Sequence, residues 1–251
     1  MEAWETVLNK FLAEWKEKDE VVGAVLAGSY ATGSATDHSD IDIHIVLADN
    51  VDWRERGNKI VDGFLIEYFA NPVPQIKKYF EDEHQKNRRT CATMYAAGKI
   101  LFDKNETVQT LQSESKEFIT KPFRKQSDAE VEILKYYLWD QLDNLKELNL
   151  TKSPIFNYAY FKALSKIIDV YAGFLQVEIA PPSKIYKYYT DEGFRKKYLI
   201  DKFPDDNFTD LAVECLVRSD YSNIEKLTEY TFDQMDEFNI DGWKLHSKVE
   251  E

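Results

Sequence analysis

The sequence has few cysteines, no long apolar run and no excess of basic residues. Its two cysteines, Cys91 and Cys215, lie far apart, so they predict neither a disulfide framework nor a zinc site. Such thiols are typical of a reducing compartment, and we expect a cytoplasmic protein. No stretch is long and apolar enough to span a bilayer. Glu2, Glu5 and Glu14 interrupt the apolar run that a signal peptide would need, so neither secretion nor a membrane partner is expected.

Acidic residues outnumber basic residues by 45 to 32, which gives a formal net charge of −13. An acidic field repels a phosphate backbone, so DNA and RNA are not expected as substrates. The same field would attract a small cationic molecule, although acidity can also serve only to keep a protein soluble. The 251 residues, of which 43% are hydrophobic, suffice for one large or two modest globular domains.

Residue periodicity changes near Lys121-Pro122, where we place a domain boundary. Before it, apolar runs and helical spacing alternate, whereas after it the patterns predict only helices. The strands are predicted over 21–27, 41–47, 63–70 and 100–102. The helices are predicted over 4–15, 75–97, 108–118, 128–148, 153–177, 183–199, 208–218 and 222–238, with capping boxes at Ser127/Glu130 and Ser222/Glu225. We therefore expect an α+β protein, with a small mixed-sheet catalytic domain over 1–120 and an all-α helical bundle over 121–251.

Two aspartates lie on one face of the strand predicted over 41–47. Alternation with a period of two places Asp40, Asp42 and His44 on one face and three isoleucines on the other. Neighbouring carboxylates repel each other and lose water, which destabilises a fold unless they have a partner. Mg²⁺ removes that penalty and is commonly held by one or two carboxylates together with substrate phosphate oxygens. The pattern predicts a nucleoside triphosphate site, whereas His44 is more simply explained as a packed residue.

Gly28-Ser29 ends the first predicted strand, and ten residues separate Ser29 from Asp40. Glycine lets the backbone approach a phosphate closely, and successive amides can form an anion-binding nest. Glu67 lies inside the third predicted strand between apolar residues, where an unpaired charge is costly. If the third strand lies beside the second, Glu67 faces the same site as Asp40 and Asp42.

Together these segments resemble the polymerase-β-like nucleotidyltransferase superfamily. The resemblance rests on A-G-S at 27–29, the ten-residue spacer and D-I-D-I at 40–43, with Glu67 where a third carboxylate is expected. The segment 98–103 and the helices after it resemble the antibiotic-modifying members, which add a nucleotide to a hydroxyl of an aminoglycoside or lincosamide. The resemblance covers about the first half of the chain.

The resemblance also implies roles for single residues. Asp40 and Asp42 would hold two Mg²⁺ ions, and Glu67 would act either as a further metal ligand or as general base. Gly28 and Ser29 would bind the β- and γ-phosphates. Further candidate contacts to phosphate or to the metal shell are Thr32, Ser39 and Lys184. Lys184 could equally be a solvated residue at the start of a helix.

The predicted function is Mg²⁺-dependent transfer of a nucleoside monophosphate, by default AMP from ATP, to a hydroxyl of a small molecule. Another nucleoside triphosphate could replace ATP, because no signal for the base is present. The helical half would bind the acceptor, and the protein would be a monomer or a homodimer. One alternative is a regulatory, antitoxin-type nucleotidyltransferase that modifies a protein partner. Another is a non-catalytic binding module, against which the complete set of site residues argues.

Overall fold

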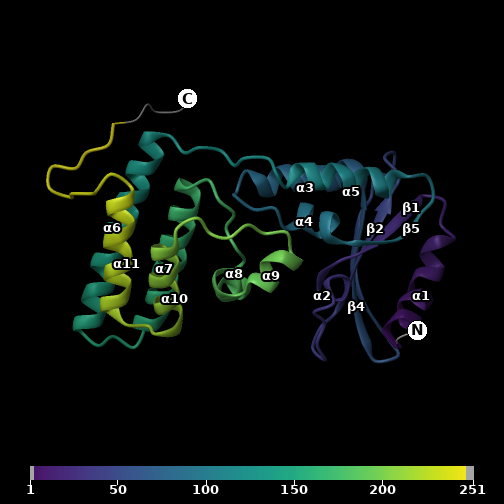
Figure 1. The fold of residues 1–251 in the computed structure, drawn as a ribbon, viewed down its shortest axis with the longest axis horizontal. Coiled ribbons are helices and arrows are strands. Elements are labelled where there is room, and N and C mark those ends of the chain that lie inside the picture. The colour runs from purple at the N-terminus through teal and green to yellow at the C-terminus, as the bar shows by residue number, and fades with distance from the viewer. Residues whose placement is uncertain (1–2, 247–251) are drawn as a thin grey trace. The chain divides into compact units, whose positions relative to one another are not determined.

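A five-stranded mixed sheet forms the centre of the first of two units in the computed structural model, which describes residues 3–246 (Figure 1). The first unit comprises Met1–Lys121 and Lys196–Ile200, and the second comprises Pro122–Arg195 and Asp201–Glu251. The strands are β1 (Val21–Leu26), β2 (Ile41–Leu47), β3 (Glu55–Val61), β4 (Phe64–Pro72) and β5 (Lys99–Asp103). Their order across the sheet is β3-β4-β2-β1-β5. Only β2 and β4 are parallel, and the other neighbours are antiparallel.

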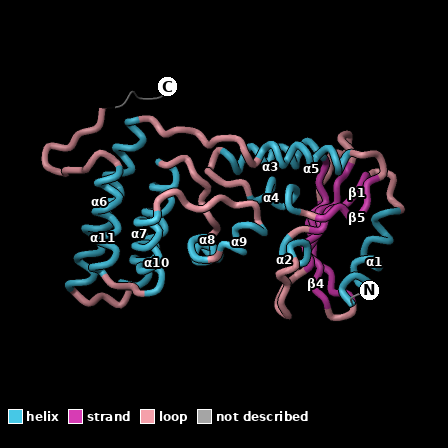
Figure 2. The backbone as a smooth tube through the Cα atoms, in the orientation of Figure 1, coloured by secondary structure: helices cyan, strands magenta, loops and turns pink. Residues whose placement is uncertain are grey.

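Helices cover both faces of this sheet (Figure 2). On one face, α1 (Ala3–Lys16) packs its apolar side against Ile41, Ile43 and Ile45 of β2. On the other face, α3 (Val73–His84), α4 (Thr90–Ala97) and α5 (Thr107–Phe118) form a second core around Val25 and Val46. The alternation of β2 therefore sends its isoleucines to α1, and it turns Asp42 and His44 toward the face of α3 and α4.

The first unit differs from the sequence-based expectation in three places. The helix expected over 75–97 is two helices, because the chain turns back on itself at 85–89, where Asn87 adopts a left-handed φ of 54°. Strand β3 was missed because its sequence, E-R-G-N-K-I-V, is polar and most of its residues are exposed. No helix was predicted between β1 and β2, and the chain forms a single-turn helix there, α2 (Gly28–Thr32).

The second unit contains helices and no strand among its described residues, which confirms the α+β assignment. The helices after residue 121 are α6 (Asp128–Leu150), α7 (Phe156–Phe174), the 3₁₀ turn η1 (Pro182–Lys184), α8 (Ile185–Thr190), α9 (Glu192–Lys197), α10 (Asp206–Val217) and α11 (Tyr221–Gln234). The helix expected over 183–199 is thus three short pieces. None of the helices within residues 3–246 is long and apolar enough to cross a membrane.

One of the two predicted capping boxes is confirmed. The Ser127 hydroxyl accepts a hydrogen bond from the Glu130 amide, and the Glu130 carboxylate accepts one from the Ser127 amide, so two backbone donors at the start of α6 are satisfied. The box at Ser222 was wrong. Asp220 caps α11 instead, because its carboxylate accepts from the Ser222 amide.

The core between α1 and the sheet allows a prediction for the truncation of one buried side chain. Ile43 is fully buried, so Ile43→Ala should lower the free energy of unfolding of the first unit by about 2–5 kcal/mol, through lost burial and the cavity left behind. Ile60→Ala is the matched control, because Ile60 is 74% exposed and its truncation should leave stability within about 0.5 kcal/mol. Urea unfolding of both variants measures the difference, and equal losses would contradict this description of the core.

Candidate functional site

Three carboxylates meet on the face of the sheet that α3 and α4 partly cover. Asp42 of β2 and Glu67 of β4 occupy paired positions of the parallel ladder, and Asp40 lies just before β2. One oxygen from each of Asp40, Asp42 and Glu67 lies within 4.8 Å of the others, and all three side chains are partly buried. Such closely spaced anions repel each other, and oxygen donors in this number suit a hard divalent cation. The three residues could therefore hold Mg²⁺.

Gly28 fits directly against this cluster. Its φ of +63° is left-handed, and a Cβ at this position would lie 1.9 Å from Oδ2 of Asp42. The Ala27 amide also donates to the Asp42 carbonyl oxygen, at 2.9 Å. Only glycine allows the end of β1 to turn into α2 so close to the carboxylate. Ser29 follows Gly28 and lies in the first turn of α2.

The other predicted contacts lie in less direct positions. The Thr32 hydroxyl bonds within α2 and to Ser34 Oγ at 2.8 Å, and Ser39 Oγ accepts from the Thr36 amide at 2.9 Å. Both side chains thus stabilise the loop between α2 and β2. Lys184 ends η1 in the second unit. The structure brings together Asp40, Asp42, Glu67 and the Gly28 backbone, and the roles of the remaining residues stay predictions.

Arg56 is a site residue that the sequence interpretation missed. Its guanidinium forms an ion pair with Glu67 at 2.7 Å and lies 4.7 Å from the Phe69 ring centre. It comes from β3, which pairs with β4 through the two-residue turn Asp62-Gly63. Both turn residues have positive φ, and an Asp-Gly pair between strands is a strong hairpin signal that could have revealed β3.

His44 continues the row of Asp40 and Asp42 along β2, and it is packed as expected. Its ring stacks on Phe69 at 5.3 Å and meets the edge of Tyr95 at 5.1 Å. Burial lowers the pKa of His44 to about 4, so the ring is neutral at physiological pH. Its Nε2 has no hydrogen-bond partner within the described residues.

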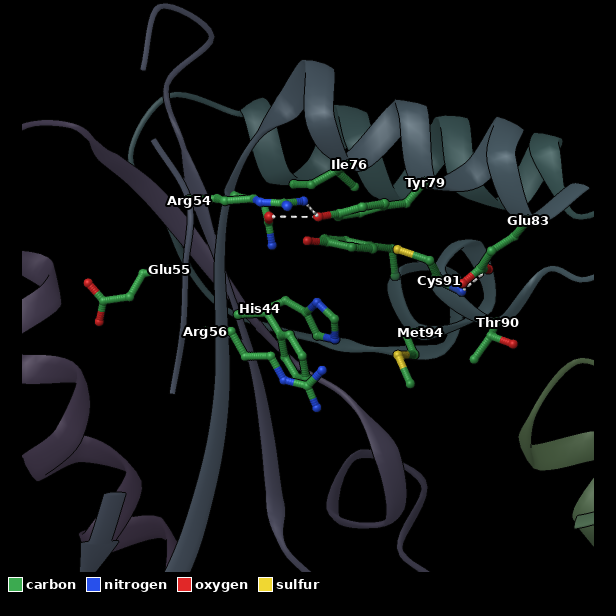
Figure 3. A pocket seen from close by; sticks show the side chains of 13 residues that line it. His44, Arg54, Glu55, Arg56, Ile76, Tyr79, Glu83, Thr90, Cys91 and Met94 are labelled. Atoms are coloured by element: carbon green, nitrogen blue, oxygen red, sulfur yellow. Dashed lines mark hydrogen bonds between the residues drawn. The ribbon is translucent and has the colours of Figure 1, made fainter. Parts of the chain in front are cut away.

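A cavity of about 570 Å³ begins beside His44 and Phe69 (Figure 3). Its walls come from β2, β3, β4, α3 and α4, so it lies entirely within the first unit. Arg54 and Tyr79 lie at one end, joined by a hydrogen bond of 2.6 Å, and Thr90 and Glu83 lie at the other. Burial raises the pKa of the Glu83 carboxyl. Sequence patterns could not reveal this cavity, because separate helices and strands form it.

Comparison with known proteins agrees with this geometry. A family described as the nucleotidyltransferase domain matches residues 8–92. A curated protein of Methanocaldococcus jannaschii, whose name proposes a protein adenylyltransferase, is 34% identical over 106 residues, which cover 39% of this chain and 71% of that protein. The chain belongs to the nucleotidyltransferase domain family. The resemblance to the polymerase-β-like superfamily is thereby confirmed, and the chain is a nucleotide-transferring enzyme.

A solved structure is also similar to this nucleotidyltransferase. The nucleotidyltransferase-like protein from Exiguobacterium sibiricum 255-15 covers 93% of this chain and 74% of its own, with 12% identity and a TM-score of 0.45. At that score the likeness supports no conclusion about the site or its substrate.

Because Gly28 lies so close to Asp42, alanine at position 28 should lower activity more than alanine at another left-handed glycine. Gly28→Ala should lower nucleotide transfer by roughly 100-fold, because the new Cβ displaces the Asp42 carboxylate. Gly33→Ala is the matched control, since Gly33 also has a left-handed φ, of +67°, but nothing lies within 4 Å of a Cβ there. Steady-state rates of pyrophosphate release measure both, and similar losses would show that backbone strain, rather than the contact with Asp42, limits activity.

Proposed function

We propose that this enzyme transfers a nucleoside monophosphate, by default AMP from Mg-ATP, to a hydroxyl group of a small molecule. The observation that carries the proposal is the cluster of Asp40, Asp42 and Glu67 with the Gly28 bend against it. Two Mg²⁺ ions, as the family resemblance implies, would offset the charge of the three acidic side chains, and phosphate oxygens of the nucleotide would complete their coordination.

In this mechanism the acceptor oxygen forms a bond to the α-phosphorus, and the bond from that phosphorus to the bridging oxygen of the β-phosphate breaks. The hydroxyl proton passes to Glu67 or to water, and pyrophosphate leaves. Asp40 and Asp42 would hold the two Mg²⁺ ions, which when bound would supply positive charge to the entering and leaving oxygens. Arg56 positions Glu67 through its ion pair.

The triphosphate would bind at the end of β1. Gly28 and Ser29 are the proposed contacts of the β- and γ-phosphates, because the chain turns there with no Cβ in the way. Thr32, Ser39 and Lys184 are proposed as further contacts. We assign residues 1–120 to catalysis and residues 121–251 to binding the remainder of the acceptor.

A protein acceptor is the second candidate function. The named activity of the Methanocaldococcus jannaschii relative favours it, since that protein is proposed to adenylylate proteins. Antibiotics of the aminoglycoside and lincosamide type represent the small-molecule candidates, and the net charge of −13 suits a cationic acceptor.

The decisive experiment measures pyrophosphate release from Mg-ATP with aminoglycosides, lincosamides and purified proteins as acceptors. Asp42→Asn should lower the acceptor-dependent rate by at least roughly 100-fold, because the metal and the reacting groups lose their alignment. Asp62→Asn is the matched control, because Asp62 is exposed in the β3–β4 turn and pairs with Lys10. Equal rates for wild type and Asp42→Asn with every acceptor would refute the proposal.

A further inference from the structure

The cavity between the sheet and helices α3 and α4 begins two residues further along β2 and β4 than the carboxylates of Asp42 and Glu67. Asp42 is followed two residues later by His44, and Glu67 is followed two residues later by Phe69, which are paired in the same ladder. Each step of two residues along a strand is about 6.6 Å, so the cavity begins about that far from the carboxylates. Arg56 links the two places, because it lines the cavity and bonds to Glu67.

The order of the strands determines which reactant this cavity can serve, if the proposed function is correct. The proposed phosphate contacts follow β1, on one side of β2, whereas Glu67 and the cavity-lining residues of β3 and β4 lie on the other side. An in-line displacement requires the attacking and leaving oxygens on opposite sides of the phosphorus. With pyrophosphate leaving toward β1, the attacking hydroxyl arrives from the side of β4 and the cavity.

Two buried polar groups in the cavity wall have no partner within the described residues. They are Nε2 of His44 and the hydroxyl of Tyr95, whose residues are 7% and 1% exposed. A buried polar atom without a partner is costly, and it is satisfied when a ligand with matching polar atoms binds. The surrounding walls include the Tyr79 ring, whose aromatic surface suits a flat ring, whereas the Phe69 ring is already in contact with His44 and Arg56.

The cavity lining contains two arginines and two glutamates, so it lacks the acidic excess that gives the whole chain its net charge of −13. Arg54 donates to the hydroxyl of Tyr79, and it has no carboxylate partner among the residues that the structure describes. Glu55 points away from the other lining residues in Figure 3 and accepts a hydrogen bond from the Tyr68 hydroxyl. Glu83, at the far end, is occupied by the Cys91 amide at 2.7 Å. An anionic group of a ligand would therefore find its partner at Arg54.

We propose that this cavity is the acceptor site next to the reacting hydroxyl, and that it selects a hydroxylated heteroaromatic ring carrying a carboxylate or phosphate. The hydroxyl lies toward Glu67, polar ring atoms bond to His44 and Tyr95, and the acidic group meets Arg54. The acceptor's O–H bond breaks as its oxygen joins the α-phosphorus, with pyrophosphate as the leaving group. An acidic acceptor of this kind differs from the polycationic aminoglycosides.

A matched series of probes tests the proposal. Pyridoxine, 4-pyridoxate and pyridoxamine share one hydroxylated pyridine ring and differ at one substituent, which is a hydroxymethyl, a carboxylate or an aminomethyl group. Calorimetric titration without nucleotide measures their binding separately from catalysis. Wild type should bind 4-pyridoxate about fivefold more tightly than pyridoxine, because the carboxylate gains one partly exposed ion pair. It should bind pyridoxamine least tightly of the three.

Two variants locate the binding. Arg54→Gln should abolish the preference for 4-pyridoxate and leave pyridoxine binding unchanged. Tyr95→Phe should weaken all three probes by about fivefold without lowering Tm, because its hydroxyl has no partner to lose in the unliganded protein. Lys59→Gln is the matched control on β3, since Lys59 pairs with Glu14 of α1 and does not line the cavity. An unchanged preference in Arg54→Gln, or no binding of any probe, would overturn the proposal.

Mass spectrometry of each probe incubated with enzyme and Mg-ATP tests the acceptor role separately. Wild type should add a nucleoside monophosphate to 4-pyridoxate, and Asp42→Asn should bind this probe as wild type does without forming the adduct. Binding that depends on Arg54, combined with no adduct on the probe, would overturn the acceptor assignment. If wild type also releases no pyrophosphate with any acceptor, the proposed function fails as well, which distinguishes the two failures.

Discussion

Repulsion among three carboxylates is the constraint on which the rest of the site depends. The parallel pairing of β2 with β4 fixes Asp42 beside Glu67, and alternation along β2 adds Asp40 to the same face. The isoleucine side of β2 is buried against α1, so the strand cannot turn its acids toward solvent without exposing its core. Because one face of β2 is buried, the carboxylates on its other face stay close together. A cation and the Arg56 guanidinium can offset the repulsion between them.

The sequence permits prediction of this cluster because its signals are local. Asp40 and Asp42 interrupt a β-branched strand with a period of two, and Glu67 is a charge within an apolar strand. Such patterns place side chains on a face without knowledge of the tertiary fold. The α+β division was predictable for the same reason, because helical spacing and a capping box follow residue 121. The residue that caps α11 could not be predicted in this way. Asp220 and Ser222 are both good N-cap residues, and only the path of the backbone selects Asp220.

The Asp62-Gly63 pair signals the hairpin that contains β3, but the pairing of Arg56 with Glu67 and the shape of the cavity depend on packing that sequence patterns do not show. Strand β3 lies at a sheet edge, so it has no apolar face to produce a pattern, and it is held by pairing with β4. The break between α3 and α4 lets both helices line the cavity with β2. The net charge of −13 does not predict the charge that a ligand meets in the cavity, because Arg54 lines the cavity. Local partners decide which charge a ligand meets.

Asp40, Asp42 and Glu67 should bind divalent cations as a group, and manganese binding tests this most directly. Electron paramagnetic resonance measures free Mn²⁺, whose signal falls as the protein binds the ion. Wild type should bind it saturably, and Asp42→Asn and Glu67→Gln should each weaken binding by at least about 10-fold, while Asp62→Asn binds as wild type. Equal binding by all four proteins would contradict the claim.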